Sequence, residues 1–191
     1  MHTTDTILEK VLDTIKEYAD KAHDRQMRKY TPERYIVHPV RVMRTCMEYT
    51  ADLPVLAAAL LHDVLEDTPV TQEEMLHFLL TVMTKEEAEK TMALVVDLTD
   101  VYVKKDFPKL NRRARKAKET ERLKDTSPLS QTIKYADIID NCNEIVTHDP
   151  GFARVFLYEC RNNLKVLDKG DPSLYLQALA TVNAAISQLR R

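Results

Sequence analysis

Hydrophobic positions along this chain recur every three or four residues, the spacing of one buried face of an α-helix. The first such stretch, residues 5–23, places these side chains on one side: Ile7, Val11, Leu12, Ile15 and Tyr18. Thr4 or Asp5 can cap its start. Further helix starts are indicated by proline as the first residue of a helix and by capping-box pairs: Pro39, Thr71 with Glu74, Thr84 with Glu87, Pro128 and Pro172.

One stretch differs from these amphipathic segments. Residues 53–65 are apolar on nearly every side, and only His62 and Asp63 interrupt them near the end. A helix that is hydrophobic all round is buried, so this segment is predicted to be the central helix of the fold. Two polar side chains at such a position need partners.

Composition agrees with helices throughout. The 191 residues include only 2 Gly and no Trp, charged residues make up 30%, and hairpin dipeptides such as Asn-Gly or Asp-Gly are absent from the sequence. The pattern predicts an all-α protein of about nine helices. Its length fits one compact domain over residues 1–191, with no internal repeat.

Other sequence features bear on the setting of the protein. No basic start leads into an apolar stretch, and no apolar run reaches about 18 residues, so we expect a soluble, cytoplasmic protein without a membrane segment. The three cysteines are widely spaced and set among apolar or helical neighbours, which favours buried, reduced thiols over a disulfide or a zinc site: Cys46, Cys142 and Cys160. A homo-oligomer is possible.

Charge is distributed unevenly. The chain has a net charge of -2, yet residues 104–124 carry ten Lys or Arg against three acids, a local charge of +7. A helical nucleic-acid binder is therefore one hypothesis. The basic charges follow helical positions with Phe107 as the one aromatic residue among them, and the whole chain is mildly acidic, so we regard nucleic-acid binding as the weaker hypothesis.

The candidate chemistry begins at His62 and Asp63. The side chains of consecutive residues on a helix point about 100° apart, so His62 and Asp63 can bind one ion only if it lies between their two directions. His38, at the predicted start of a helix, and Asp137, flanked by apolar residues, are suitable further ligands. Two imidazoles and two carboxylates suit manganese, iron or zinc, and manganese is the first choice.

Two more acids follow on the same helix. Glu66 comes four residues after His62, and Asp67 four after Asp63, which places both carboxylates about one turn along. Carboxylates next to a metal can position a water molecule and accept its proton. His62 and Asp63 could also form a hydrogen-bonded pair at a helix end, His38 could be a capping residue and Asp137 a satisfied buried acid. It is their joint presence that predicts a site.

Several segments together resemble the hydrolase domain of Rel/SpoT-type alarmone enzymes, within the HD-domain superfamily, and especially the stand-alone small alarmone hydrolases. The matching segments lie in the family's order and span roughly residues 20–145: residues 23–28 (HDRQMR), 36–39 (IVHP), 58–68 (AALLHDVLEDT), 98–100 (LTD), 107–112 (FPKLNR) and 134–137 (KYAD). Residues 149–190 would then be C-terminal packing helices.

This resemblance implies a function. His38, His62, Asp63 and Asp137 match the metal ligands, and Glu66 and Asp67 match the catalytic acids. The positions that line the nucleotide are matched by four residues: Arg28, Lys29, Lys109 and Asn141. The family removes the 3′-pyrophosphate of guanosine tetraphosphate or pentaphosphate with manganese, so the chain is expected to hydrolyse this nucleotide.

The sequence departs from the family in three places. Residues 31–35 read TPERY where the family usually has Gly-Glu-Pro-Tyr, Arg25 replaces a common glycine, and Ile138 replaces a basic residue. The alternative substrates are therefore another nucleotide or a nicotinamide dinucleotide phosphate. A non-catalytic nucleotide sensor is a further alternative, but it predicts the loss of a ligand or acid, and the sequence shows none.

Overall fold

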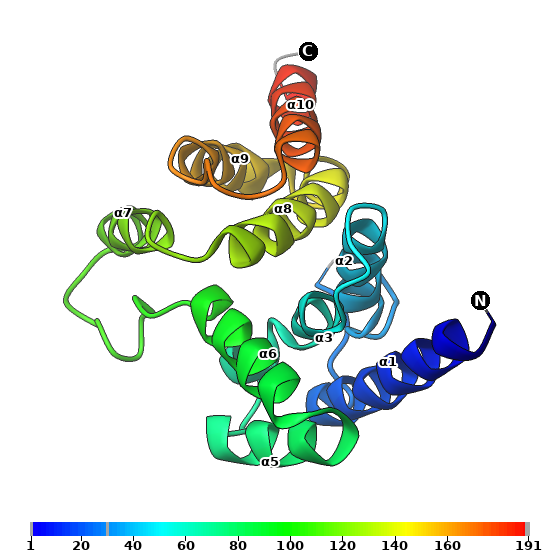
Figure 1. Cartoon of the computed structure of the whole chain (residues 1–191). Helices are drawn as coiled ribbons and strands as arrows, with labels where there is room; N and C mark the ends of the chain where they lie inside the picture. The colour runs from blue at the N-terminus through cyan, green and yellow to red at the C-terminus, as the bar shows by residue number, and fades with distance from the viewer. Residues whose placement is uncertain (1, 30, 190–191) are drawn as a thin grey trace. The chain divides into compact units, whose positions relative to one another are not determined.

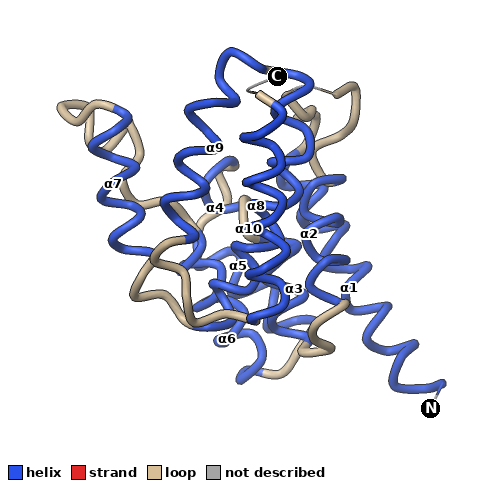
Figure 2. The backbone as a smooth tube through the Cα atoms, turned by 90° about the horizontal axis from the view of Figure 1, so that it is seen from above, coloured by secondary structure: helices blue, strands red, loops and turns tan. Residues whose placement is uncertain are grey.

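The computed structural model describes residues 2–29 and 31–189, without the side chains of residues 2–5. Within these ranges the chain forms ten α-helices joined by loops, and only an isolated bridge between Met27 and Arg34 interrupts the helical character (Figures 1 and 2). The chain divides into two compact units, residues 1–99 and 100–191. The predicted all-α class is confirmed.

Unit 1 is built around a short buried helix. It contains α1 (His2–His23), α2 (Val37–Met47), α3 (Leu53–Leu61), α4 (Val64–Asp67), α5 (Gln72–Val82) and α6 (Lys85–Leu98). Helices α1, α2 and α6 all pack against α3, which lies among them in Figure 1. Every α3 residue from Pro54 to Leu61 is buried, as the apolar pattern predicts.

Three predicted boundaries are wrong. Helix α2 begins at Val37, two residues before the predicted start at Pro39, so His38 lies inside the helix. The first helix begins at His2, so Thr4 and Asp5 lie within it and cannot be its N-cap. The central helix does not continue from residue 53 to 65, because it stops at Leu61 and a turn at His62 and Asp63 leads into α4. The helix propensities of these residues do not predict the break, because His62 and Asp63 both keep right-handed helical backbone angles although the helix is interrupted there.

Both predicted capping boxes are present. Thr71 accepts a hydrogen bond from the Glu74 backbone N–H at the start of α5, and the Glu74 side chain accepts one from the Thr71 N–H. Thr84 and Glu87 make the same pair of bonds at the start of α6. Each box satisfies two backbone donors that a helix start otherwise leaves to water.

Unit 2 contains α7 (Arg112–Leu123), α8 (Pro128–His148), α9 (Pro150–Leu164) and α10 (Pro172–Gln188). Helix α8 packs against α9 and α10, and α7 packs against α9. The buried Tyr135 hydroxyl donates to the Leu167 carbonyl at 2.8 Å. Gly170 lies so close that a Cβ there would stand 2.5 Å from the Tyr135 ring, so this connection requires glycine.

The three cysteines are free and buried, as predicted. Burial raises the pKa of the Cys46 thiol to about 12, so it stays protonated and unreactive near neutral pH. Among the residues that the structure describes, no helix combines the length and apolar character that crossing a bilayer requires.

Candidate metal centre

Three of the predicted metal ligands meet in unit 1. His38 is the second residue of α2, His62 follows the end of α3, and Asp63 precedes α4. Asp63 Oδ2 lies 3.1 Å from His62 Nε2 and 3.5 Å from His38 Nε2. Only 1% of His38 and 2% of His62 is exposed, so these nitrogens converge on one carboxylate oxygen away from bulk water.

The orientation of the His62 ring suits a metal ligand. Its Nδ1 lies 2.8 Å from the Ala59 carbonyl oxygen, one turn earlier in α3. A carbonyl can only accept, so Nδ1 carries the hydrogen and, in the neutral ring, Nε2 keeps its lone pair. A hydrogen bond of this kind fixes the tautomer and the orientation of metal-binding histidines.

Tyr35 holds Asp63 from the other side. Its hydroxyl donates to Asp63 Oδ2 at 2.6 Å, and its ring packs against His23, with 4.4 Å between ring centroids. Burial, followed by the negative charges of Asp63 and Asp67, raises the pKa of Tyr35 well above its usual range. The phenol therefore remains a hydrogen-bond donor. Sequence reasoning missed this role, although the position of Tyr35 one turn before His38 could have suggested it.

Glu66 and Asp67 are the last two residues of α4, which directly follows His62 and Asp63, two of the predicted ligands. Both residues are exposed, whereas His38 and His62 are buried. Asp67 is close enough to contribute to the raised pKa of Tyr35. The two acids are thus accessible from solvent at the edge of the histidine and aspartate cluster.

The fourth predicted ligand belongs to unit 2. Asp137 lies in the middle of α8 and is 6% exposed. Lys134 Nζ lies 2.8 Å from its Oδ2, and the Asn141 amide donates to Oδ1 at 2.6 Å. Asn141, predicted to line the nucleotide, therefore has its amide nitrogen on Asp137. A buried carboxylate held by a cation and an amide keeps its negative charge at acceptable cost.

The other predicted nucleotide contacts differ in exposure. Arg28 is half-buried, and its guanidinium carbon lies 5.9 Å from the centre of the Tyr35 ring. Lys29 and Lys109 are exposed. The loop at residues 31–35, whose sequence differs from the family pattern, is ordered by Glu33. The Glu33 carboxylate accepts hydrogen bonds from the Thr31 hydroxyl at 3.0 Å and from Arg41 at 3.0 Å.

The donor set of unit 1 fits a divalent transition metal. Two imidazole nitrogens lie 3.1 and 3.5 Å from the same carboxylate oxygen of Asp63. Histidine and carboxylate ligands suit zinc, iron and manganese, and the hydrogen bonds from His62 to Ala59 and from Tyr35 to Asp63 are outer contacts that orient such ligands.

Comparison with known proteins defines the class. The model of the HD domain family matches residues 16–144, and the chain belongs to this family. A human protein named guanosine-3′,5′-bis(diphosphate) 3′-pyrophosphohydrolase MESH1 is 35% identical over 134 residues, which cover 68% of this chain and 66% of that protein, slightly less than two thirds of its length. A guanosine-3′,5′-bis(diphosphate) 3′-pyrophosphohydrolase of Vibrio cholerae is 51% identical over 57 residues, 30% of this chain and 8% of that protein.

Two solved structures share the fold. One, described as "A metazoan ortholog of SpoT hydrolyzes ppGpp and plays a role in starvation responses", has a TM-score of 0.74 at 23% identity and covers 93% of this chain and 94% of that chain. The other, lmo0812 from Listeria monocytogenes, has a TM-score of 0.61 at 21% identity and covers 83% of this chain and 99% of that chain. The predicted HD-domain membership and helical fold are confirmed.

Proposed function

We propose that this chain is a metal-dependent phosphohydrolase that removes the 3′-pyrophosphate of guanosine tetraphosphate or pentaphosphate. The observation that carries the proposal is the convergence of His38 and His62 on Asp63, within a member of the HD domain family. Two relatives that carry the name of this activity point to the same substrate.

The proposed shell consists of His38, His62, Asp63 and Asp137, with manganese as the metal. Asp137 enters as a buried carboxylate on α8 in the segment that resembles the family. The family model spans residues 16–144 and so includes parts of both units, which supports one HD domain over residues 1–191. A divalent ion at this shell would polarise a phosphate group and lower the pKa of a water molecule towards neutrality.

The protein's own residues divide the remaining tasks. Glu66 and Asp67, exposed on α4, are placed to orient the attacking water and accept its proton. Tyr35 holds Asp63 in position. The cationic side chains of Arg28, Lys29 and Lys109, with Asn141, are proposed to bind the nucleotide and to offset the negative charge that develops on the leaving group.

The test is a product analysis. Purified protein with manganese and guanosine tetraphosphate should release intact pyrophosphate and a nucleotide that keeps its 5′-diphosphate, as separated by anion-exchange chromatography. His62→Ala should lose this activity at least about a hundredfold, because a ligand is removed. The matched variant His77→Ala, at an exposed position of α5, should retain it.

Two outcomes would count against this assignment. Release of orthophosphate alone would contradict removal of the 3′-pyrophosphate as one intact group. Cleavage of another nucleotide or a nicotinamide dinucleotide phosphate, without turnover of any guanosine 3′-pyrophosphate, would move the assignment to that substrate. The ordered loop at residues 31–35, which differs from the family, is where such a change of base recognition would originate.

A further inference from the structure

The loop that precedes α7 in unit 2 carries Lys109, one of the residues proposed to bind the nucleotide. Residues 100–111 of this loop form no helix or strand. Loops of this length without secondary structure of their own are uncommon in compact domains, and many of them are functional. The contacts that hold this loop therefore bear on how Lys109 meets a substrate.

Lys109 lies in a tight turn near the end of the loop. The Leu110 backbone N–H donates to the Phe107 carbonyl at 3.1 Å, and Pro108 occupies the second position of this four-residue turn. Proline favours that position because its φ angle is already fixed near the value that the turn requires. Lys109 follows at the third position with an exposed side chain. Its direction depends on how the turn is attached to the rest of unit 2.

Helix α7 holds the loop on both sides of the turn. After the turn, the Arg115 guanidinium donates to the Leu110 carbonyl, and Asn111 is the N-cap of α7, where its side chain accepts a backbone hydrogen bond at 2.9 Å. Before the turn, the Lys116 ammonium pairs with the Asp100 carboxylate. The loop is thus attached to α7 near both of its ends.

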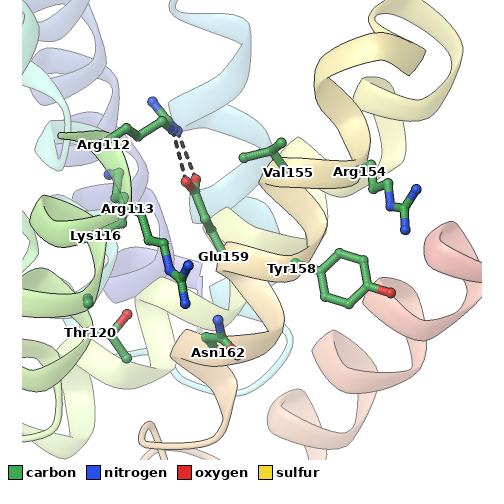
Figure 3. Close-up of a pocket in the computed structure, with 10 residues that line it drawn as sticks. Arg112, Arg113, Lys116, Thr120, Arg154, Val155, Tyr158, Glu159 and Asn162 are labelled. Atoms are coloured by element: carbon green, nitrogen blue, oxygen red, sulfur yellow. Dashed lines mark hydrogen bonds and ion pairs between the residues drawn. The ribbon is translucent and has the colours of Figure 1, made fainter.

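Helix α7 is itself fixed to α9. The Arg112 guanidinium donates to both Glu159 carboxylate oxygens at 2.9 and 2.8 Å, as Figure 3 shows. Further along α7, the Thr120 hydroxyl donates to the Asn163 side chain at 2.6 Å. Functional groups are held most precisely when a rigid element supports them. A helix tied at two points along its length is such a support for the loop.

Glu119 is the central anchor between α7 and the loop. It is 3% exposed, and its Oε2 accepts hydrogen bonds from the Val101 and Tyr102 backbone N–H groups, both at 3.0 Å. Its other carboxylate oxygen accepts one from the Arg122 guanidinium. A buried carboxylate is costly unless it is paired and hydrogen-bonded, and two of its bonds here go to main-chain donors of the loop. The Glu119 carboxylate therefore fixes the loop backbone.

An aromatic contact joins this anchor to the turn. The Tyr102 ring packs on the Phe107 ring with 4.8 Å between centroids, and Lys118 Nζ of α7 lies 5.5 Å from the centre of the Tyr102 ring. Phe107 is also the first residue of the turn that contains Lys109. A continuous set of contacts thus runs from Glu119 through the two rings to Lys109.

We propose that Glu119 is a positioning residue of the hydrolytic reaction, because it holds the loop on α7 and so keeps Lys109 in one place for the phosphates of the nucleotide. This role rests on the proposed function, in which Lys109 binds the substrate. A cation that is already in place loses less conformational freedom when it meets phosphate, so it contributes more to binding. Release of the loop should therefore weaken substrate binding although Lys109 itself remains.

The test is steady-state turnover of guanosine tetraphosphate with manganese by wild type and Glu119→Gln. The variant keeps the shape of the side chain, but an amide nitrogen that cannot accept a hydrogen bond replaces one oxygen. KM should rise at least about fivefold while kcat falls by less than about twofold, since binding is affected more than the chemical step. Glu121→Gln, the same change at an exposed position of α7, should leave both constants unchanged.

A double-mutant cycle with Lys109→Ala separates positioning from a general structural effect. Lys109→Ala alone should raise KM at least about tenfold, because a hydrogen bond to a charged phosphate is lost. If Glu119 acts through Lys109, Glu119→Gln should raise KM by less than about twofold further in that background. Effects of the two substitutions that simply multiply would overturn the positioning role.

Trypsin digestion follows the loop without any substrate. Cleavage after Lys104 and Lys105 should be at least about fivefold faster in Glu119→Gln than in Glu121→Gln, because the released loop opens more often. Equal cleavage rates, or an unchanged KM in Glu119→Gln, would overturn the role of Glu119 and leave the proposed function standing. Absence of turnover by the wild-type chain would overturn both.

Thermal unfolding establishes that each variant is folded. Tyr102→Leu provides a second variant if Glu119→Gln does not fold, because it removes the aromatic link to Phe107 and leaves the buried carboxylate in place. It should raise KM in the same direction, and this increase should also vanish in the Lys109→Ala background. An unchanged KM in a folded Tyr102→Leu protein would contradict the path of contacts from Glu119 to Lys109.

Discussion

At the turn between α3 and α4, the adjacent side chains of His62 and Asp63 approach each other closely. Neighbours in a regular helix diverge by about 100°, but here α3 has ended and His62 Nε2 lies 3.1 Å from Asp63 Oδ2. The Ala59 carbonyl fixes one residue of the pair and the Tyr35 hydroxyl the other. Residues outside the proposed ligand set therefore determine how the His62 and Asp63 side chains are oriented.

Tyr35→Phe should weaken manganese binding at least about tenfold, because it removes the donor to Asp63 Oδ2 while keeping the ring against His23. The measurement is a titration of metal against a chromophoric chelator. Tyr175→Phe, which removes a phenolic hydroxyl in unit 2, serves as the control and should bind metal normally. Unchanged affinity in Tyr35→Phe would rule out a positioning role.

Glu66→Gln and Asp67→Asn should keep the metal and lose turnover by about a hundredfold or more, because each removes a proton acceptor and retains the shape of the side chain. Metal content from elemental analysis and kcat from product release separate the two effects. The exposed Glu73 on α5 offers a matched Glu73→Gln control. Near-normal kcat in both acid variants would remove these acids from the mechanism.

At the scale of helices, unit 1 combines a buried centre with helix starts that are closed by side chains. Helix α3 has no polar face and depends on α1, α2 and α6 to cover it. Helix α6 is one of these covering helices, and its first turn is completed by Thr84 and Glu87. Hydrogen bonds from the Thr84 hydroxyl at 2.7 Å and from the Thr84 backbone N–H at 2.9 Å lower the pKa of the Glu87 carboxyl.

Thr84→Ala should lower the free energy of unfolding by about 1 kcal/mol at neutral pH, the usual cost of losing an N-cap. Because the pKa of Glu87 is lowered in the folded state, its contribution is present above the unfolded pKa and disappears as pH falls through the folded pKa. The cost of Thr84→Ala should therefore shrink in strong acid. Urea unfolding at neutral pH and in strong acid measures the change in the free energy of unfolding, with Thr14→Ala on the exposed face of α1 as the control. An equal cost of Thr84→Ala at the two pH values would show that the charge of Glu87 does not contribute to this cap.

At the scale of the molecule, the proposed metal shell draws ligands from both units. His38, His62 and Asp63 belong to residues 1–99 and Asp137 to residues 100–191. A metal that binds only the folded chain adds about 3 kcal/mol of stability at a hundred times its dissociation constant. A metal held by the proposed shell would therefore couple metal binding to folding.

Manganese should raise the temperature of thermal unfolding of the wild-type chain, and a chelator should reverse the rise. Asp137→Asn should lose most of this metal-dependent increase, because an amide is a poorer ligand than a carboxylate. Asp125→Asn, at an exposed position of the same unit, should behave like wild type. A full metal-dependent increase in Asp137→Asn would exclude it from the shell.

Much of this architecture can be predicted from the sequence alone, because helix-forming signals are local. The spacing of apolar residues and the pairs Thr71–Glu74 and Thr84–Glu87 act within a few residues of each other, and the structure confirms the helices that they predict. His38, His62 and Asp63 could likewise be proposed as one site, since each is a strong ligand in an apolar setting.

Tertiary structure decided the features that depend on residues distant in the sequence. The break in the central helix, the Tyr35 bond to Asp63 across 28 positions, and the attachment of the loop before α7 to the side chains of that helix leave no local pattern. The basic segment illustrates this best: counting gives +7, but only folding shows that Arg112 and Lys116 are paired with acids while Arg113 reaches towards α9. Electrostatic partners and cavities arise when helices pack, so their chemistry is set by contacts and not by spacing along the chain.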